Sequence, residues 1–165
     1  MAISKKRIFL GIDPGFGRMG WGVVEAEGMK LAAAEWGCWE TPKEECLAKR
    51  LCFLAKEMRQ TIMKWKPDAV IIEDLFFFKN LKTAIKVAEA RGMAILVAAE
   101  NNAPIIELTP LQVKQAISGY GRADKSQMQT MVKMILKLEK IPKPDDAADA
   151  LAMAIAGAAY FGKRY

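Results

Sequence analysis

Two short hydrophobic runs in this chain each end on a carboxylate. Residues 8–12 lead into Asp13, and residues 69–72 lead into Glu73. Apolar runs of this length, bounded by turn residues such as Pro14, indicate buried strands rather than helices. A carboxylate at the end of a buried strand loses hydration, so it needs a compensating positive partner. The two runs therefore favour a fold in which buried strands deliver acidic groups to one edge of a sheet.

The rest of the chain predicts a mixed sheet with helices packed on it. The expected strands are short apolar or alternating runs, at 7–12, 20–26, 30–39, 69–73 and 105–108. Helices are expected at 43–65, 81–100, 110–118, 125–138 (with Asp124 as its N-cap) and from 146 onward, and the first of them has Leu47, Leu51, Leu54 and Met58 on one face. This order predicts the α/β class, with a three-strand antiparallel meander plus two parallel strands in a five-stranded mixed sheet and helices on both faces. We expect residues 1–165 to form a single domain.

Composition excludes several kinds of chemistry. The chain has no histidine, which rules out the usual zinc sites and His-dependent catalytic triads. Cys38, Cys46 and Cys52 lack the spacing of a thiolate metal site and are odd in number, so no disulfide framework is expected. A net charge of +6 favours an anionic partner such as nucleic acid. With no signal-like or membrane-spanning stretch, we expect a cytoplasmic protein that does not contact the membrane.

Two further carboxylates open the last apolar segment. Asp146 and Asp149 are three residues apart, so both project from one face of the first turn of the expected helix. If the first and fourth strands are parallel neighbours, Asp13 and Glu73 meet at their carboxyl ends, where α/β sheets place their sites. Magnesium prefers oxygen ligands, and two ions about 4 Å apart can activate a water and stabilise the leaving oxygen of a phosphodiester. We expect two Mg²⁺ per active site, with Mn²⁺ as a possible substitute.

Each of these residues also has a simpler interpretation. Asp13 can start a turn with Pro14, and Asp145 and Asp146 can cap a helix. Asp74 competes with Glu73 for the functional role, because neighbours on a strand face opposite sides of a sheet. Spacing in the sequence leaves these alternatives open.

Five segments together resemble the RuvC family of Holliday-junction resolvases. They occur in the family's order and cover nearly the whole chain from residue 8 to about 160: Gly-Ile-Asp-Pro-Gly at 11–15, Ile-Glu-Asp-Leu-Phe-Phe-Phe-Lys-Asn at 72–80, Gln-Val-Lys-Gln-Ala at 112–116, Gly-Tyr-Gly-Arg-Ala-Asp-Lys-Ser-Gln at 119–127 and Asp-Ala-Ala-Asp-Ala-Leu-Ala at 146–152. The resemblance implies a ribonuclease-H-like fold and a homodimer. It also implies magnesium-dependent paired nicking of four-way (Holliday) DNA junctions in recombination and repair, with the RuvA–RuvB branch-migration machinery as partner.

The resemblance also assigns roles to residues. It makes Asp13, Glu73, Asp146 and Asp149 the catalytic metal ligands, and it selects Glu73 rather than Asp74. Some relatives have histidine where this chain has Asp146.

For the DNA, the same resemblance places Lys114 and Lys125 near the scissile phosphate and Phe76 against the crossover. Further candidates for DNA contact are Phe77, Phe78, Lys79 and Arg122. We also expect the helix from Leu81 to lie in the dimer interface, through residues that include Ala84, Val87, Ala88, Arg91, Ala94 and Ile95.

Three other functions compete with a junction-specific nuclease. An actin-like ATPase or sugar kinase also begins with a strand, Asp and Gly, but normally needs a second lobe. A non-catalytic DNA-binding module is favoured only if one of the four carboxylates is lost. A small ribonuclease-H-like nuclease acting on RNA shares the fold, so the substrate has to be measured.

Overall fold

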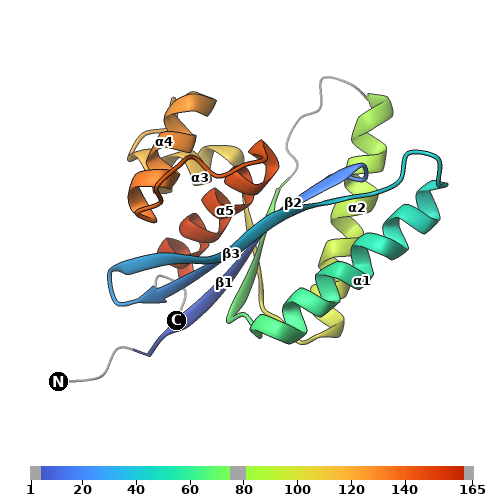
Figure 1. The fold of residues 1–165 in the computed structure, drawn as a ribbon, viewed down its shortest axis with the longest axis horizontal. Helices are drawn as coiled ribbons and strands as arrows, with labels where there is room; N and C mark the ends of the chain where they lie inside the picture. Colours follow the sequence, from blue (N-terminus) through green and yellow to red (C-terminus); the bar gives the residue numbers. More distant parts are fainter. Residues whose placement is uncertain (1–4, 75–80, 162–165) are drawn as a thin grey trace.

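A mixed five-stranded sheet forms the centre of the computed structural model, which describes residues 5–74 and 81–161 (Figure 1). The strands are β1 (Arg7–Asp13), β2 (Arg18–Glu27), β3 (Lys30–Glu40), β4 (Ala69–Glu73) and β5 (Ile105–Leu108), in the spatial order β3-β2-β1-β4-β5. The first three form an antiparallel meander, while β4 runs parallel to β1 and β5 runs parallel to β4. The predicted α/β class, the five-stranded mixed sheet and the order of elements are confirmed.

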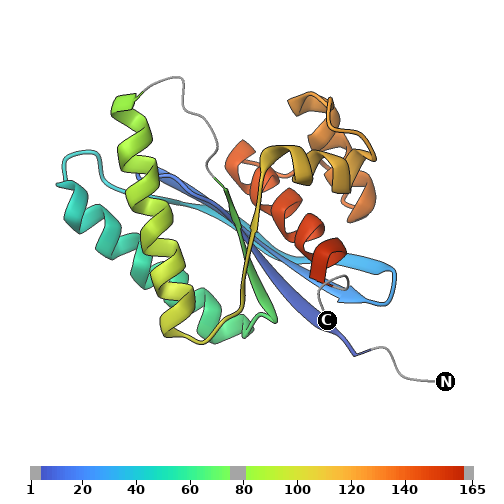
Figure 2. The ribbon, with the colours of Figure 1, turned by 180° about the vertical axis from the view of Figure 1, so that it is seen from behind.

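Helices cover both faces of this sheet (Figures 1 and 2). They are α1 (Leu47–Trp65) and α2 (Leu81–Glu100) on one face, and α3 (Pro110–Ser118), α4 (Lys125–Ile135) and α5 (Asp145–Phe161) on the other. Each face has its own apolar core, because alternate strand residues point to opposite sides. Leu10 and Ile72 belong to the core under α1 and α2, whereas Phe9 and Ile71 belong to the core under α5. Within the described residues, no helix combines the length and apolar character needed to cross a bilayer.

Two helix boundaries differ from the sequence prediction. The first helix begins at Leu47 rather than 43, because the chain leaving β3 first makes a turn in which the Glu45 amide donates to the Pro42 carbonyl at 3.4 Å. The fourth helix ends at Ile135 rather than 138. Lys137 adopts a left-handed backbone with φ of 54°, and the Leu138 amide bonds back to the Lys133 carbonyl at 2.9 Å. That pattern closes a helix and turns the chain out of it.

Glycines allow α5 to lie directly on the strands. A Cβ atom on Gly11 of β1 would collide with the backbone carbonyl of Ala150, and one on Gly20 of β2 would collide with the carbonyl of Asp146. Because these glycines have no side chain, the backbone of α5 approaches the backbone of the sheet closely. This contact places the first two turns of α5, which carry Asp146 and Asp149, beside the end of β1.

The register between β1 and β4 sets the positions of the other two carboxylates, Asp13 and Glu73. Ile12 of β1 pairs with Ile72 of β4, so the residues that follow them, Asp13 and Glu73, lie at the same level. Asp13 shares a strand face with Gly11, and Glu73 shares one with Ile71; both faces pack against α5. The fold therefore directs Asp13 and Glu73 toward the first turns of α5.

Candidate active site

Three of the four predicted carboxylates line one small cavity. Asp13, Glu73 and Asp149 share a cavity of about 90 Å³, which is closed by Pro110, Val113 and Met153. The carboxylates come from the ends of two parallel strands and from the second turn of α5. They are thus brought together from three elements that are far apart in the sequence.

The fourth carboxylate, Asp146, lies beside this cavity without lining it. Its Oδ2 is 3.0 Å from a terminal guanidinium nitrogen of Arg18, which stands at the start of β2 and also lies 3.6 Å from Glu40 through Nε. Sequence reasoning missed Arg18, because nothing in the local pattern marks a cation at the start of a strand as the partner of an aspartate 128 residues later. Asp146 is still close enough to raise the pKa of Asp13.

The carboxylates raise one another's affinity for protons. Burial, followed by the charges of Asp149, Glu73 and Asp146, raises the pKa of Asp13 to about 8. Burial and the Asp149 charge raise the pKa of Glu73, and burial raises the pKa of Asp149 despite the opposing charge of Lys125. The cavity therefore holds more negative charge than its surroundings neutralise, which is the condition a divalent cation relieves.

The chemistry of these residues fits a hard divalent cation. All four offer carboxylate oxygens, the donor type that magnesium prefers. In the described part of the chain, no three Asp, Glu, His or Cys side chains already converge as a complete ligand set. Two of the four are instead turned toward cations, Asp146 to Arg18 and Asp149 to Lys125. The donor type and the unneutralised charge support a metal site. To coordinate a cation, Asp146 must leave its contact with Arg18, and Asp149 must leave its contact with Lys125.

Lys125 is the cation nearest to the cavity. It is the first residue of α4, where Asp124 forms the N-terminal capping box with Gln127. Its Nζ lies 3.4 Å from Asp149 and 3.5 Å from Asp145. Partial burial would lower the pKa of Lys125, but the charges of Asp149 and Asp145 outweigh it and raise that pKa. The ammonium group therefore stays charged at the rim of the cavity.

The other predicted DNA contacts have no ion pair with the carboxylates or lie outside the described residues. Lys114 is partly exposed on α3, whose residues Pro110 and Val113 line the cavity, and Arg122 is exposed on the loop before α4. Among the described residues, no ion pair involves either Lys114 or Arg122. Phe76, Phe77, Phe78 and Lys79 lie outside the described residues.

Arg91 of α2 holds the end of the strand that carries Glu73. Its Nε donates to the Glu73 backbone carbonyl at 2.8 Å, and its terminal nitrogen contacts Asp74 at 3.5 Å and pairs with Glu107 of β5. This contact distinguishes the two acidic neighbours, because Glu73 faces the cavity and Asp74 faces Arg91. No local sequence signal marks Arg91 for this task.

The same helix corrects one detail of the dimer prediction. Ala84 and Ala94 are 8% and 0% exposed, and they pack on the sheet rather than facing a partner. Arg91 likewise turns toward its own chain. Ala84 and Ala94, which were expected to face a second copy, thus serve the packing of the protein itself, whereas Ala88 is exposed.

Comparison with known proteins identifies the family. The family model described as crossover junction endodeoxyribonuclease RuvC matches residues 9–157. The crossover junction endodeoxyribonuclease RuvC of Petrotoga mobilis is 52% identical over 147 residues, covering 89% of this chain and 90% of the relative. The structure of Thermus thermophilus RuvC in complex with a Holliday junction substrate superimposes with a TM-score of 0.89 at 33% identity, covering 94% of both chains.

A more distant structure shares the fold alone. The yeast mitochondrial Holliday junction resolvase Ydc2 superimposes with a TM-score of 0.64 at 17% identity, covering 90% of this chain and 76% of Ydc2. Family model, sequence identity and structural superposition agree over the same elements that carry the four carboxylates. This chain belongs to the RuvC family of crossover junction endodeoxyribonucleases.

Proposed function

We propose that this protein resolves four-way (Holliday) DNA junctions by hydrolysing phosphodiester bonds at symmetric positions in two strands. The observation that carries the proposal is the cavity lined by Asp13, Glu73 and Asp149, with Asp146 beside it, in a member of the RuvC family. The relative from Thermus thermophilus, solved with a Holliday junction substrate, supports the same substrate for this chain.

Asp13, Glu73, Asp146 and Asp149 would hold Mg²⁺, two ions per site, with Mn²⁺ as a substitute. Bound there, the metal supplies activation of the attacking water and stabilisation of the charge on the leaving oxygen. The carboxylates supply oxygen donors from three separate elements, so they hold their relative positions through the packing of α5 on the sheet. Their raised proton affinity means that cation binding at neutral pH is coupled to proton release from Asp13.

Lys125 and Arg18 supply positive charge on either side of the carboxylates. Lys125 lies within 3.4 Å of Asp149, and Arg18 lies within 3.0 Å of Asp146. When the carboxylates turn to a cation, both side chains are released at the rim of the cavity, where they can face a phosphate. Lys125 is the better placed for this role, because it begins a helix whose N-terminal amides also favour an anion.

A second copy of the chain would supply the second active site, because one site cuts one strand and a junction needs two cuts. The side chains on the outer face of α2 form a suitable surface. Ile85 and Leu96 are 63% and 58% exposed, and the exposed small residues Ala88 and Gly92 lie between them on the same face. Large apolar groups flanking small ones allow two helices to approach closely. We propose this stripe as the dimer interface, and RuvA–RuvB as the partner that brings junctions to the dimer.

The test is cleavage of a synthetic four-way DNA junction in Mg²⁺, with wild type compared with Asp13→Asn. Paired nicks at symmetric positions, absent in the variant and in EDTA, are expected, with linear duplex DNA cut far more slowly. Junction binding without cleavage in any divalent metal would indicate a binding module. Preferential cleavage of an RNA–DNA hybrid, or turnover of ATP, would indicate one of the other two functions.

A further inference from the structure

A groove on the α5 side of the sheet joins an exposed tryptophan to a row of lysines. The groove has a volume of about 490 Å³ and is lined by Trp36 of β3 and by residues 137–143. Residues 137–143 belong to the segment that connects α4 to α5 (Figure 1). Lys137, Lys140 and Lys143 line it, and Glu139 is the one acidic residue among its lining groups in the described part of the chain. Its walls therefore have a net positive charge.

The position of Trp36 is set by strand pairing. Trp36 pairs with Gly22 of β2, and a Cβ atom built on Gly22 meets Leu151 of α5. Paired residues on neighbouring strands share a face, so the Trp36 side chain emerges on the α5 side. It stays 36% exposed there, whereas Trp39, on the other face, is 8% exposed and stacks on Trp21. An indole on the surface beside lysines is a feature that the hydrophobic core does not account for.

Two of the three lysines form no ion pair within the described part of the chain. Lys143 pairs with Asp145 at 3.0 Å, but neither Lys137 nor Lys140 forms an ion pair with any described residue. Lys137 is held in place by its left-handed backbone at the end of α4. The groove thus presents two ammonium groups without an ion-pair partner among the described residues, next to an aromatic face.

The groove leads to the carboxylates. Its last lysine, Lys143, contacts Asp145, which directly precedes Asp146. On the sheet side, Arg18 links Asp146 to Glu40 near the end of β3, the strand that carries Trp36. A polymer entering the active site would therefore continue along this groove.

We propose that the groove formed by Trp36, Lys137, Lys140 and Lys143 binds the DNA strand adjacent to the scissile phosphate, an inference that rests on the proposed nuclease function. The lysines contact successive phosphates, and the indole packs on a sugar or an unstacked base. This surface would extend DNA contact from Lys125 along the segment that connects α4 to α5, since Lys125 and Lys143 both contact Asp145.

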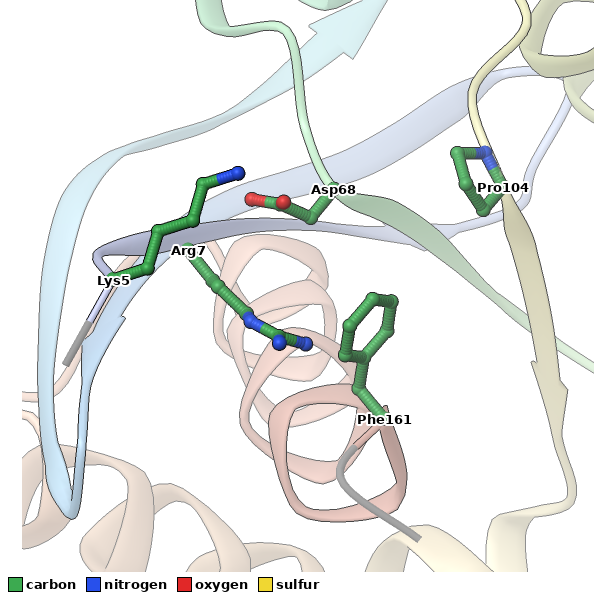
Figure 3. A pocket seen from close by; sticks show the side chains of 5 residues that line it. All are labelled: Lys5, Arg7, Asp68, Pro104 and Phe161. Carbon is green, nitrogen blue, oxygen red and sulfur yellow. The ribbon is translucent and has the colours of Figure 1, made fainter. Parts of the chain in front are cut away.

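A second cavity is less suited to DNA. It measures about 450 Å³ and is lined by Lys5, Arg7, Asp68, Pro104 and Phe161, at the opposite end of β1 from Asp13 (Figure 3). The Arg7 guanidinium group in this cavity stacks on Phe161, and its Cζ atom lies 4.6 Å from the centre of the Phe161 ring. The Asp68 carboxylate, which accepts the Ile8 amide at 2.8 Å, adds negative charge. This end of the sheet has no contact with the carboxylate cavity.

The test measures affinity for a labelled four-way junction in EDTA over a range of salt concentrations. The groove variant is Lys137→Asn with Lys140→Gln, because asparagine tolerates the left-handed backbone at position 137. The matched control is Lys30→Gln with Lys56→Gln, which removes the same charge from exposed lysines on the β2–β3 hairpin and on α1. We expect the groove variant to bind about tenfold more weakly at physiological salt and to lower the salt-dependence slope by between about one and two. The control should stay within about twofold of wild type.

Trp36 is tested separately. Trp36→Ala should weaken junction binding about tenfold, and Trp36→Phe should restore most of it, because a phenyl ring retains the stacking face. Melting temperatures of all variants are compared to exclude unfolding. If wild type cuts the junction but the groove variants match the control in affinity and slope, the groove inference is overturned and the nuclease function stands. If wild type neither binds nor cuts the junction, the proposed function itself fails.

Discussion

Glu73 and Asp74 are adjacent carboxylates with different surroundings. Glu73 ends β4 on the side of α5 and lines the cavity with Asp13. Asp74 lies on the other side, where its amide bonds to the Leu108 carbonyl and its carboxylate faces Arg91. The alternation of side chains along a strand makes one of them available to a metal and the other available to a structural cation.

The substitutions Glu73→Gln and Asp74→Asn, which replace each carboxylate by the corresponding amide, should separate these two roles. Glu73→Gln removes a charged oxygen donor from the cavity, so junction cleavage should fall by at least about a hundredfold, a loss of roughly 3 kcal/mol in transition-state stabilisation. Asp74→Asn should retain most of the activity. Single-turnover cleavage in Mg²⁺ gives both rates, and equal losses in the two variants would contradict the assignment of Glu73.

Asp13 should make the stability of the metal-free protein depend on pH. Its pKa is raised to about 8 in the folded chain, so the native state keeps a proton that the unfolded state releases above about pH 4. Stability from this group is therefore present below its ordinary pKa and is lost as pH rises toward 8. Asp13→Asn keeps a neutral group at every pH, so it should be more stable than wild type in EDTA by several kcal/mol at pH 8, with little difference near pH 4.

Urea unfolding at several pH values measures this difference. Added Mg²⁺ should stabilise wild type by binding the native state and should have much less effect on the variant. A constant difference between the two proteins from pH 4 to 8 would show that Asp13 ionises normally.

At the scale of elements, the contact between α5 and the sheet positions the active site. Gly11 and Gly20 let the helix backbone approach the strands, and Gly157 of α5 packs in the same way on Ile71. The buried face of α5 consists largely of alanines, which keep the separation small. The geometry of the carboxylates is thus a consequence of small residues that have no chemical role.

Gly11→Ala should move this helix. The added methyl group meets the Ala150 backbone, which cannot rotate away, so we expect a loss of about 3 kcal/mol in unfolding free energy and a large loss of cleavage. Gly92→Ala is the matched control for stability, because a Cβ atom there meets nothing within 4 Å of the same chain and alanine favours a helix by about 1 kcal/mol. Because Gly92 belongs to the proposed dimer stripe, this control is compared in unfolding and not in cleavage. Thermal unfolding ranks the two variants, and equal stability would show that α5 can shift without cost.

At the scale of the whole molecule, the apolar stripe of α2 and the lysine groove lie on different faces of the sheet. The exposed apolar stripe of α2 lies on the face opposite α5, so a dimer formed through it leaves the active site and the lysine groove of each copy accessible. This separation matches a protein that binds a second copy on one side and a polyanion on the other.

Leu96→Glu should disrupt the dimer by placing two like charges in an apolar interface. Sedimentation should then show a monomer, and junction cleavage should yield single nicks in place of paired ones. Met63→Glu on α1 is the matched control, since Met63 is 63% exposed but lies outside the stripe. If the Leu96 variant remains dimeric, α2 is not the interface.

The positions of β1 and β4, and of the carboxylates that end them, followed from the sequence by itself, because strand length, apolar runs and turn residues are local properties. The order of the strands and helices in residues 5–74 and 81–161 followed for the same reason. The contacts that these carboxylates and their strands make with other elements could not be predicted from the sequence. Arg18 beside Asp146, Arg91 on the Glu73 carbonyl and the burial of Ala84 and Ala94 depend on which faces meet after the sheet and helices pack. Only the tertiary structure decided them, since contacts between distant residues depend on the relative placement of whole elements and leave no periodic signal in the chain.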